Sequence, residues 1–183
     1  MRKLNGIVSM CIIVLFLIHA AMGALQLTGL IPGGSLFMKA AAWTMVAFTV
    51  VHMVIGIKLT ADTLKALKKS GAGYFRENRL FWIRRISGMA IIAFIAVHVM
   101  VFLGSQEGGA FRLTEFNAIR LAGQILLVVS VALHVISNIK PLMLGLGAKD
   151  HKALGADMLF VISVMLLLSG IAFVIYYIRW RVF

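Results

Sequence analysis

The stretch ISGMAIIAFIAVHVMVFL, residues 86–103, contains eighteen residues without a charge, and its only polar side chains are those of Ser87 and His98. An apolar run of this length indicates a membrane-spanning helix, because about 20 such residues cross the hydrocarbon core of a bilayer. Four comparable runs lie at about 6–30, 40–59, 119–144 and 158–178. The sequence therefore predicts an all-α integral membrane protein, with a bundle of five transmembrane helices in a single domain, residues 1–183.

The composition excludes an ordinary soluble domain. Of the 183 residues, 62% are hydrophobic and 13% are charged, whereas globular chains carry about 45–50% apolar and about 25% charged residues. The net charge of +12 can indicate nucleic-acid binding, but the basic residues lie between apolar spans and lack interleaved aromatic residues. We expect contact with membrane lipid and no nucleic-acid partner. The single Cys11 also excludes a disulfide within the chain.

The distribution of Lys and Arg predicts the orientation. With the N-terminus in the cytoplasm, thirteen basic residues lie on the inner side of the membrane and five on the outer side. This excess satisfies the positive-inside rule and places the N-terminus in the cytoplasm and the C-terminus outside. Arg179 and Arg181 argue mildly the other way, but late charges usually carry less weight.

The longest inner loop, from Thr60 to Ile83, contains an amphipathic stretch. Apolar and basic residues alternate there before a glycine break, at Leu64, Lys65, Leu67, Lys68, Lys69, Gly71 and Gly73. Such a segment can rest on anionic lipid. It can equally serve as a docking surface for a cytoplasmic partner, and the two interpretations are compatible.

Four of the five histidines lie inside apolar spans, one in each of the first four: His19, His52, His98 and His134. The fifth, His151, lies in a polar loop, where we expect it to be solvated. One intramembrane histidine is as readily a hydrogen-bonding group between helices as a metal ligand. Four of them raise the question of whether they pair at matching depths.

Counting residues from the span ends sorts the four histidines into two levels. His19 and His98 each follow the inner end of a span by about 12 residues, or roughly 18 Å. His52 lies 7 residues from an inner end and His134 lies 6 residues before Lys140, which places both roughly 10 Å from the inner edge. The sequence thus predicts two histidine pairs that each cross between helices.

Two such pairs at two depths are what two six-coordinate b-type haems require, because each iron takes one imidazole on either side of its plane. His19 and His98 would hold an outer haem, and His52 and His134 an inner one. Zinc explains the pattern less well, because a structural zinc site needs four ligands at one point. Without a C-x-x-C-H motif, the haem would be bound noncovalently.

Small and polar residues near these histidines fit the same interpretation. Gly23 follows His19 by one turn and Gly56 follows His52 by one turn, although close helix packing explains small residues equally well. Candidate partners for the propionates of the inner haem are Trp82, Arg84, Arg85, Ser87 and Lys140. Positive-inside anchoring accounts for their charges equally well.

The pattern resembles the dihaem cytochrome b membrane anchor of succinate:quinone oxidoreductases, the family of succinate dehydrogenase and menaquinol:fumarate reductase. In its single-anchor members, five helices carry one ligand histidine on each of the first four, paired one with three and two with four. The segment Arg84-Arg85-Ile86-Ser87-Gly88 also looks like the R-x-S-G opening of a helix in that family. The likeness covers most of the chain.

The resemblance implies a bacterial cytoplasmic (inner) membrane complex with a cytoplasmic flavoprotein that holds FAD and an iron–sulfur subunit. This chain would then transfer electrons between that pair and menaquinone or another quinone, without dicarboxylate chemistry of its own. Candidates for the quinone site near the outer haem are Gln26, Thr28, Ser35 and Lys39, each of which an interfacial position also explains. The chain lacks the acidic residues that some members carry inside their spans, which puts a carboxylate-based proton path in doubt.

Two other functions remain open at this point. One is the cytochrome b subunit of another quinone-linked oxidoreductase, such as a hydrogenase or a formate dehydrogenase, although those anchors tend to place two ligands on one helix. The other is a haem-free transporter or structural anchor whose histidines pack helices together. A transporter would more often show repeats or broken helices at mid-membrane, and the sequence offers none convincingly.

Overall fold

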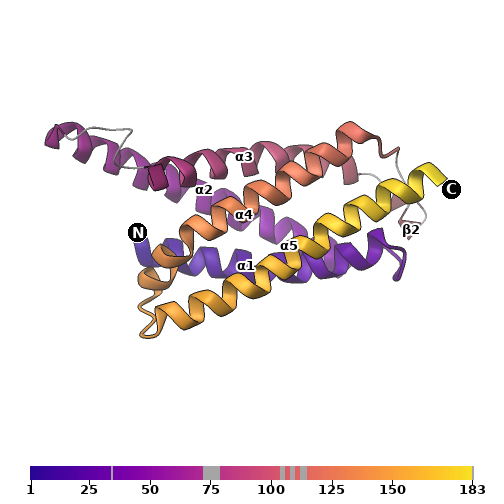
Figure 1. The fold of residues 1–183 in the computed structure, drawn as a ribbon, viewed down its shortest axis with the longest axis horizontal. Helices are drawn as coiled ribbons and strands as arrows, with labels where there is room; N and C mark the ends of the chain where they lie inside the picture. Colours follow the sequence, from indigo (N-terminus) through magenta and orange to yellow (C-terminus); the bar gives the residue numbers. More distant parts are fainter. Residues whose placement is uncertain (34, 72–78, 104–105, 108–109, 112–114, 183) are drawn as a thin grey trace.

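The computed structural model describes residues 1–33, 35–71, 79–103, 106–107, 110–111 and 115–182. Five helices run side by side along the length of the molecule (Figure 1): α1 (Arg2–Leu27), α2 (Leu36–Ser70), α3 (Arg79–Phe102), α4 (Ala118–Leu146) and α5 (His151–Val182). All five are long and apolar enough to cross a membrane. The architecture is that of a multi-pass membrane protein.

The connection between α3 and α4 contains a short hairpin that the sequence pattern did not predict. Its strands, β1 (Gln106–Glu107) and β2 (Ala110–Phe111), are two residues each and pair antiparallel. Arg112, which entered the count of outer charges, lies outside the described residues, as do Gly73 and Arg76 of the inner loop and the side chain of His151.

The helices extend beyond the predicted apolar runs. The largest extension is in α2, which continues eleven residues past position 59 to Ser70, so the amphipathic stretch of the inner loop is part of this helix. It ends at Gly71, whose φ of 66° is left-handed and therefore suits glycine. Lys68 and Lys69 lie in the last turn, where positive charge interacts favourably with the helix dipole.

Helix packing places α1 against α2, α4 and α5, and places α4 against α3 and α5 as well. A buried cluster joins the ends of α1 and α3 to α5 and to the segment just before α4, and it consists of Leu27, Val101, Phe116, Ala172, Phe173 and Tyr176. Within it the rings of Phe116 and Tyr176 meet edge to face at 4.9 Å. This cluster fixes the end of α3 just beyond His98, and so positions that side chain.

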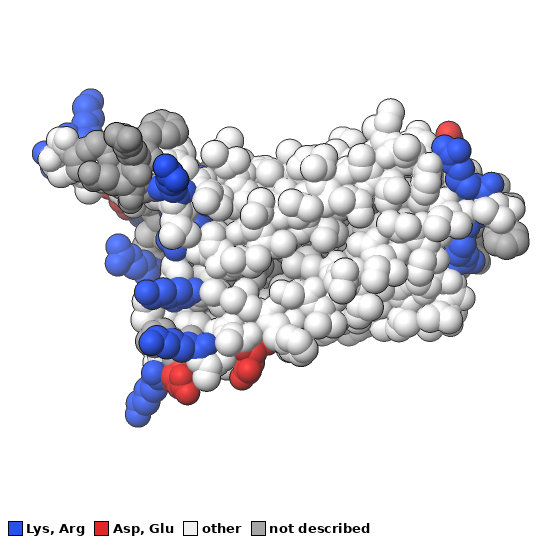
Figure 2. Space-filling model, viewed as in Figure 1, with Lys and Arg blue, Asp and Glu red and all other residues white. Residues whose placement is uncertain are grey.

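The surface has charged residues at both ends and an uncharged band between them (Figure 2). The two chain termini lie at opposite ends of the bundle (Figure 1). Many large apolar side chains in the band are exposed, among them Met89, Met100 and Phe160. Monomeric soluble proteins rarely expose apolar patches of this extent, whereas lipid-facing surfaces require them.

Candidate functional site

The structure brings the four intramembrane histidines together in two pairs. The imidazole centroids of His19 (α1) and His98 (α3) are 6.0 Å apart, and those of His52 (α2) and His134 (α4) are 6.1 Å apart. The two rings in each pair are close to perpendicular, at 73° and 87°. These are the pairs that the counting of depth predicted, and each reaches across the bundle between helices that are not neighbours in sequence.

The two pairs lie at clearly separate levels. Ser9 contacts His52, Ser87 contacts His134, and Gln124 contacts His98. On α1, α3 and α4 alike, the residue at the inner level is ten or eleven positions from the residue at the outer level, which corresponds to about 15–17 Å along a helix. The counted depths predicted a separation of only about 8 Å. That value was too small because the ends of the apolar runs do not lie at equal depth.

Serine hydroxyls hold both histidines of the inner pair. Ser9 Oγ lies 3.2 Å from Nδ1 of His52 and donates its hydrogen to the backbone carbonyl of Asn5 at 2.8 Å. Ser87 Oγ lies 3.2 Å from Nδ1 of His134 and donates to the carbonyl of Ile83 at 2.6 Å. A hydroxyl has one hydrogen, so a serine that donates to the carbonyl can accept from the imidazole. The tautomer that satisfies both contacts at once carries the proton on Nδ1 and leaves the lone pair on Nε2.

The outer pair is held differently. Nδ1 of His98 lies 2.7 Å from Oε1 of Gln124, a side chain with 0% exposure, so the imidazole donates to the amide oxygen. Gln124 can approach because Gly123 lets α3 come close: a Cβ on Gly123 would meet Val97 at 3.1 Å. Nδ1 of His19 is buried without a hydrogen-bond partner among the described residues. Aromatic rings of Phe102 and Phe173 stand 5.0 Å and 6.1 Å from the ring of His98.

These features fit an iron ion between the two rings of each pair. Metal–imidazole bonds of about 2.0 Å on opposite sides of one ion place the ring centres about 6 Å apart, as observed for both pairs. A ligand imidazole usually donates its other N–H to an oxygen acceptor, and three of the four do so. No group of three or more potential metal ligands occurs in the described part of the chain, whereas axial haem ligation needs only two.

Each pair has, one helical turn from one of its histidines, a glycine with open space beside it. Gly23 lies four residues beyond His19 and Gly56 four residues beyond His52, each on the same helix face as its histidine. A Cβ added at either glycine would meet nothing within 4 Å. Both glycines are nonetheless partly buried in the bundle. A bulky planar group could therefore pack against them.

The R-x-S-G segment lies directly against the inner pair. Ser87 Oγ is in hydrogen-bond contact with Nδ1 of His134. The backbone of Gly88 packs on the same ring, since a Cβ added at Gly88 would meet Cε1 of His134 at 3.3 Å. Arg85 is half-buried, its guanidinium lies 5.1 Å from the ring centre of Phe81, and its Nε has no hydrogen-bond partner among the described residues. A half-buried, unpaired cation next to the ligands is suited to a propionate.

Arg84 has a structural partner as well. Its Nε donates to the backbone carbonyl of Ser137 at 2.7 Å. That carbonyl is free because Pro141, four residues later inside α4, has no N–H to donate. Arg84 therefore links α3 to α4 one turn inward of His134.

The remaining predicted residues are less closely associated with the pairs. Trp82 is half-buried with its ring against Phe81, and Lys140 is exposed six residues beyond His134. Among the quinone-site candidates, Gln26 is half-buried, and the hydroxyl of Thr28 donates to its own helix at Ala24. Ser35 and Lys39 are exposed at the start of α2. None of these candidates lines the pocket between α4 and α5.

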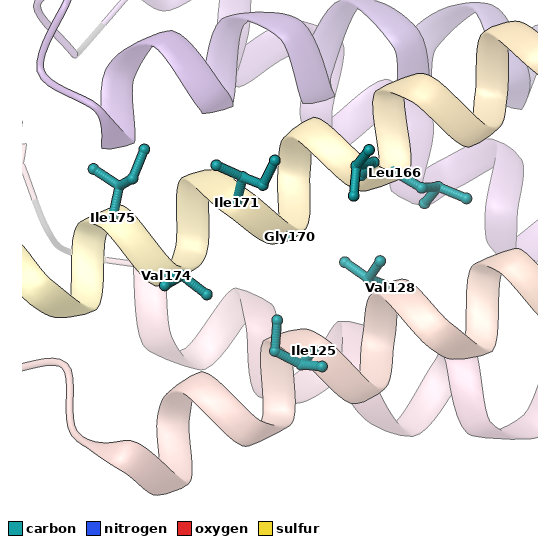
Figure 3. A pocket seen from close by; sticks show the side chains of 8 residues that line it. Ile125, Val128, Leu166, Gly170, Ile171, Val174 and Ile175 are labelled. Atoms are coloured by element: carbon teal, nitrogen blue, oxygen red, sulfur yellow. The ribbon is translucent and has the colours of Figure 1, made fainter.

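The pocket between α4 and α5 has a volume of about 370 Å³ (Figure 3). Its lining is apolar and includes Ile125, Val128, Leu166, Gly170, Ile171 and Val174. None of its lining residues is a histidine, so this pocket is not part of the paired site.

Sequence reasoning missed three residues of the site: Ser9, Gln124 and Pro141. Ser9 and Gln124 are polar residues inside apolar runs, which was a usable signal, because buried polar groups in a membrane need partners. Comparison of the chain with family models, with curated proteins and with solved structures gives no match. The assignment of the site therefore depends on the residues and their geometry.

Proposed function

We propose that this chain is the membrane-anchor cytochrome b subunit of a quinone-linked oxidoreductase, with two bis-histidine b haems. It transfers electrons between a quinone and a cytoplasmic iron–sulfur and flavoprotein pair. The observation that supports this most is the pair of imidazole contacts at 6.0 Å and 6.1 Å, with Nδ1 of three rings committed to oxygen acceptors. Histidines that only pack helices together would have no need to meet as two pairs at nearly equal ring separations.

Each residue of the site has a definite part in this function. Nε2 of the four histidines would hold the iron, and the two serines and Gln124 hold the rings in the tautomer that this requires. Haem bound there would supply a one-electron couple. With two histidines at each site, no ligand position would be left for a substrate. Arg84 and Arg85 compensate propionate charge at the inner level.

The arrangement of the two levels suggests a path for electrons across the membrane. The outer pair lies against Phe173 in the C-terminal half of α5, and the inner pair lies against Ser9 in the N-terminal half of α1. With the N-terminus in the cytoplasm, as the excess of inner basic residues favours, electrons cross between a quinone near the outer level and a partner beyond the inner level. The basic overhang of α2, residues 60–70, would face that partner.

Within this class, the succinate dehydrogenase and fumarate reductase type is our choice, in a bacterial inner membrane. It is favoured by the distribution of one histidine on each of the first four helices and by the contact of Ser87 and Gly88 with His134. Menaquinone or another quinone would be the membrane substrate. The FAD and iron–sulfur subunits would carry the dicarboxylate chemistry.

The first test is a haem count on the full chain, purified in mild detergent together with whatever co-purifies. A pyridine haemochrome assay should give about two b-type haems per chain, and a reduced-minus-oxidised spectrum should show a sharp alpha band. A folded preparation without haem would overturn the proposal and favour a transporter or structural anchor. Co-purified subunits with FAD and succinate or fumarate activity would support our choice within the class, whereas a hydrogenase or formate dehydrogenase partner would refute that choice.

A further inference from the structure

We propose that Gln124 is a positioning residue that lowers the reduction potential of the outer haem through its hydrogen bond to His98. This inference rests on the proposed function, because it requires iron on Nε2 of His98. It assigns the difference between the two haems to one buried amide on α4.

The contact is short and fully enclosed. Oε1 of Gln124 and Nδ1 of His98 are 2.7 Å apart, the closest of the three contacts between an oxygen and a ligand histidine. Gln124 has 0% exposure, and its Nε2 has no hydrogen-bond partner among the described residues. The amide therefore has this histidine as its described partner, and no solvent competes for its oxygen.

The serine contacts at the inner pair are weaker on two counts. Both are 3.2 Å long, and both serine oxygens already donate their hydrogen to a backbone carbonyl. At the outer pair, His19 has no described acceptor for Nδ1. The outer site thus depends on Gln124 alone, whereas the inner site has two modest acceptors.

The sign of the effect follows from electron donation. An acceptor on Nδ1–H makes the imidazole more basic, and a more basic ligand stabilises the ferric state, which lowers the reduction potential. Removing the acceptor should therefore raise the potential of the outer haem. A change of about tenfold in the reduction equilibrium is reasonable for one buried hydrogen bond, and this corresponds to about 59 mV for a one-electron couple.

The experiment is a redox titration of the full chain with Gln124→Met, which keeps the length of the side chain and removes the acceptor. Gln124→Glu keeps an acceptor oxygen and serves as the rescue variant. Ser169→Ala is the matched control, since it removes a polar group on α5 whose hydroxyl donates to Met165 of its own helix and touches no histidine. The outer haem is identified in the titration as the one absent from His98→Ala.

The expected result is a rise of about 59 mV for the outer haem in Gln124→Met, with the inner haem unchanged. Gln124→Glu should leave the potential at or below that of the wild type, and Ser169→Ala should change neither haem. Two bound haems with no shift, or with equal shifts of both, would overturn the inference and leave the proposed function intact. Loss of the outer haem from both Gln124 variants would also overturn it, because an acceptor oxygen in a side chain of the same size would then not suffice to retain the haem. Loss from Gln124→Met alone, with rescue by Gln124→Glu, would support it.

A wild-type chain without haem would instead overturn the proposed function itself, and the inference with it. The two failures are distinguished by the haemochrome count, which precedes the titration.

Discussion

The outer and the inner histidine pair have nearly the same geometry but different surroundings. At the outer pair, an apolar cluster and the rings of Phe102 and Phe173 surround His98, and one buried amide is the described polar partner. At the inner pair, two serines and two half-buried arginines lie close to the rings. The ligand spacing is thus common to both sites, whereas the polarity around them is set separately.

The difference indicates what each site requires. The outer level is enclosed by apolar side chains and depends on packing, so changes of volume should affect it most. The inner level has Arg84 and Arg85 close by and depends on cations. If both sites bind haem, they should respond independently to mutation.

The largest expected effect is the loss of one haem on removal of one ligand. His98→Ala or His19→Ala should abolish the outer haem and retain the inner one, and His134→Ala or His52→Ala should do the reverse, because one imidazole cannot complete the axial pair. Haemochrome counts should fall from about two to about one. His151→Ala, at the first residue of α5, is the control and should keep both. If none of the four ligand changes removes a haem, the assignment fails.

The next largest effect concerns the glycines one turn beyond each ligand. Gly23→Leu should exclude the outer haem and Gly56→Leu the inner one, because each side chain would occupy the open space that the macrocycle needs. Gly170→Leu is a matched control: it also meets nothing within 4 Å but lies in the α4–α5 pocket, away from the histidines. The measurement is haem content at equal protein recovery. Equal haem loss in all three variants would show a general folding defect and refute the selective effect.

Much of the fold could be predicted from the sequence. Long runs without charge specify helices in a bilayer, because no other element except a closed barrel satisfies the backbone there. Residue counts at 1.5 Å per residue also sufficed to group His19 with His98 and His52 with His134. The ends of the helices were less predictable. α2 continues through the amphipathic stretch to Ser70, and a search for apolar runs does not detect helical residues that are polar.

The support of the histidines was not predictable in the same way. The contact of Gln124 with His98 depends on how closely α3 and α4 approach, and the approach depends on Gly123. Likewise, the role of Arg84 follows from a carbonyl left free by Pro141, which becomes visible only when the register of the two helices is known. Haem ligation and the quinone site stay predictions.

The third effect tests that register directly. Arg84→Met should leave the carbonyl of Ser137 without a partner and lower the free energy of unfolding by about 1–3 kcal/mol. Pro141→Ala restores an N–H that can bond the same carbonyl, so the double variant should recover most of that loss. Thermal unfolding in detergent measures all four proteins of the cycle.

If the losses of unfolding free energy in this cycle are additive, Arg84 does not act on the carbonyl that Pro141 leaves without a donor. The haem content of the double variant adds a second comparison. If Arg84 also binds a propionate, the inner haem should remain weakened after stability is recovered, while the outer haem remains unaffected.

The last expected effect, which leaves the inner haem bound but less tightly, concerns the cation of Arg85. Arg85→Gln should weaken inner haem binding by about tenfold or more, because a charge-assisted hydrogen bond contributes about 1.5–3 kcal/mol. Arg181→Gln is a close match: its guanidinium lies 5.2 Å from the ring centre of Tyr177, much as that of Arg85 lies over Phe81, but at the opposite end of the bundle. Haem release to apomyoglobin, followed for each haem separately, should accelerate for the inner haem of Arg85→Gln alone. Equal release from both variants would mean that the cation acts on packing, and the inner site would then differ from the outer one in its hydroxyls rather than in its charge.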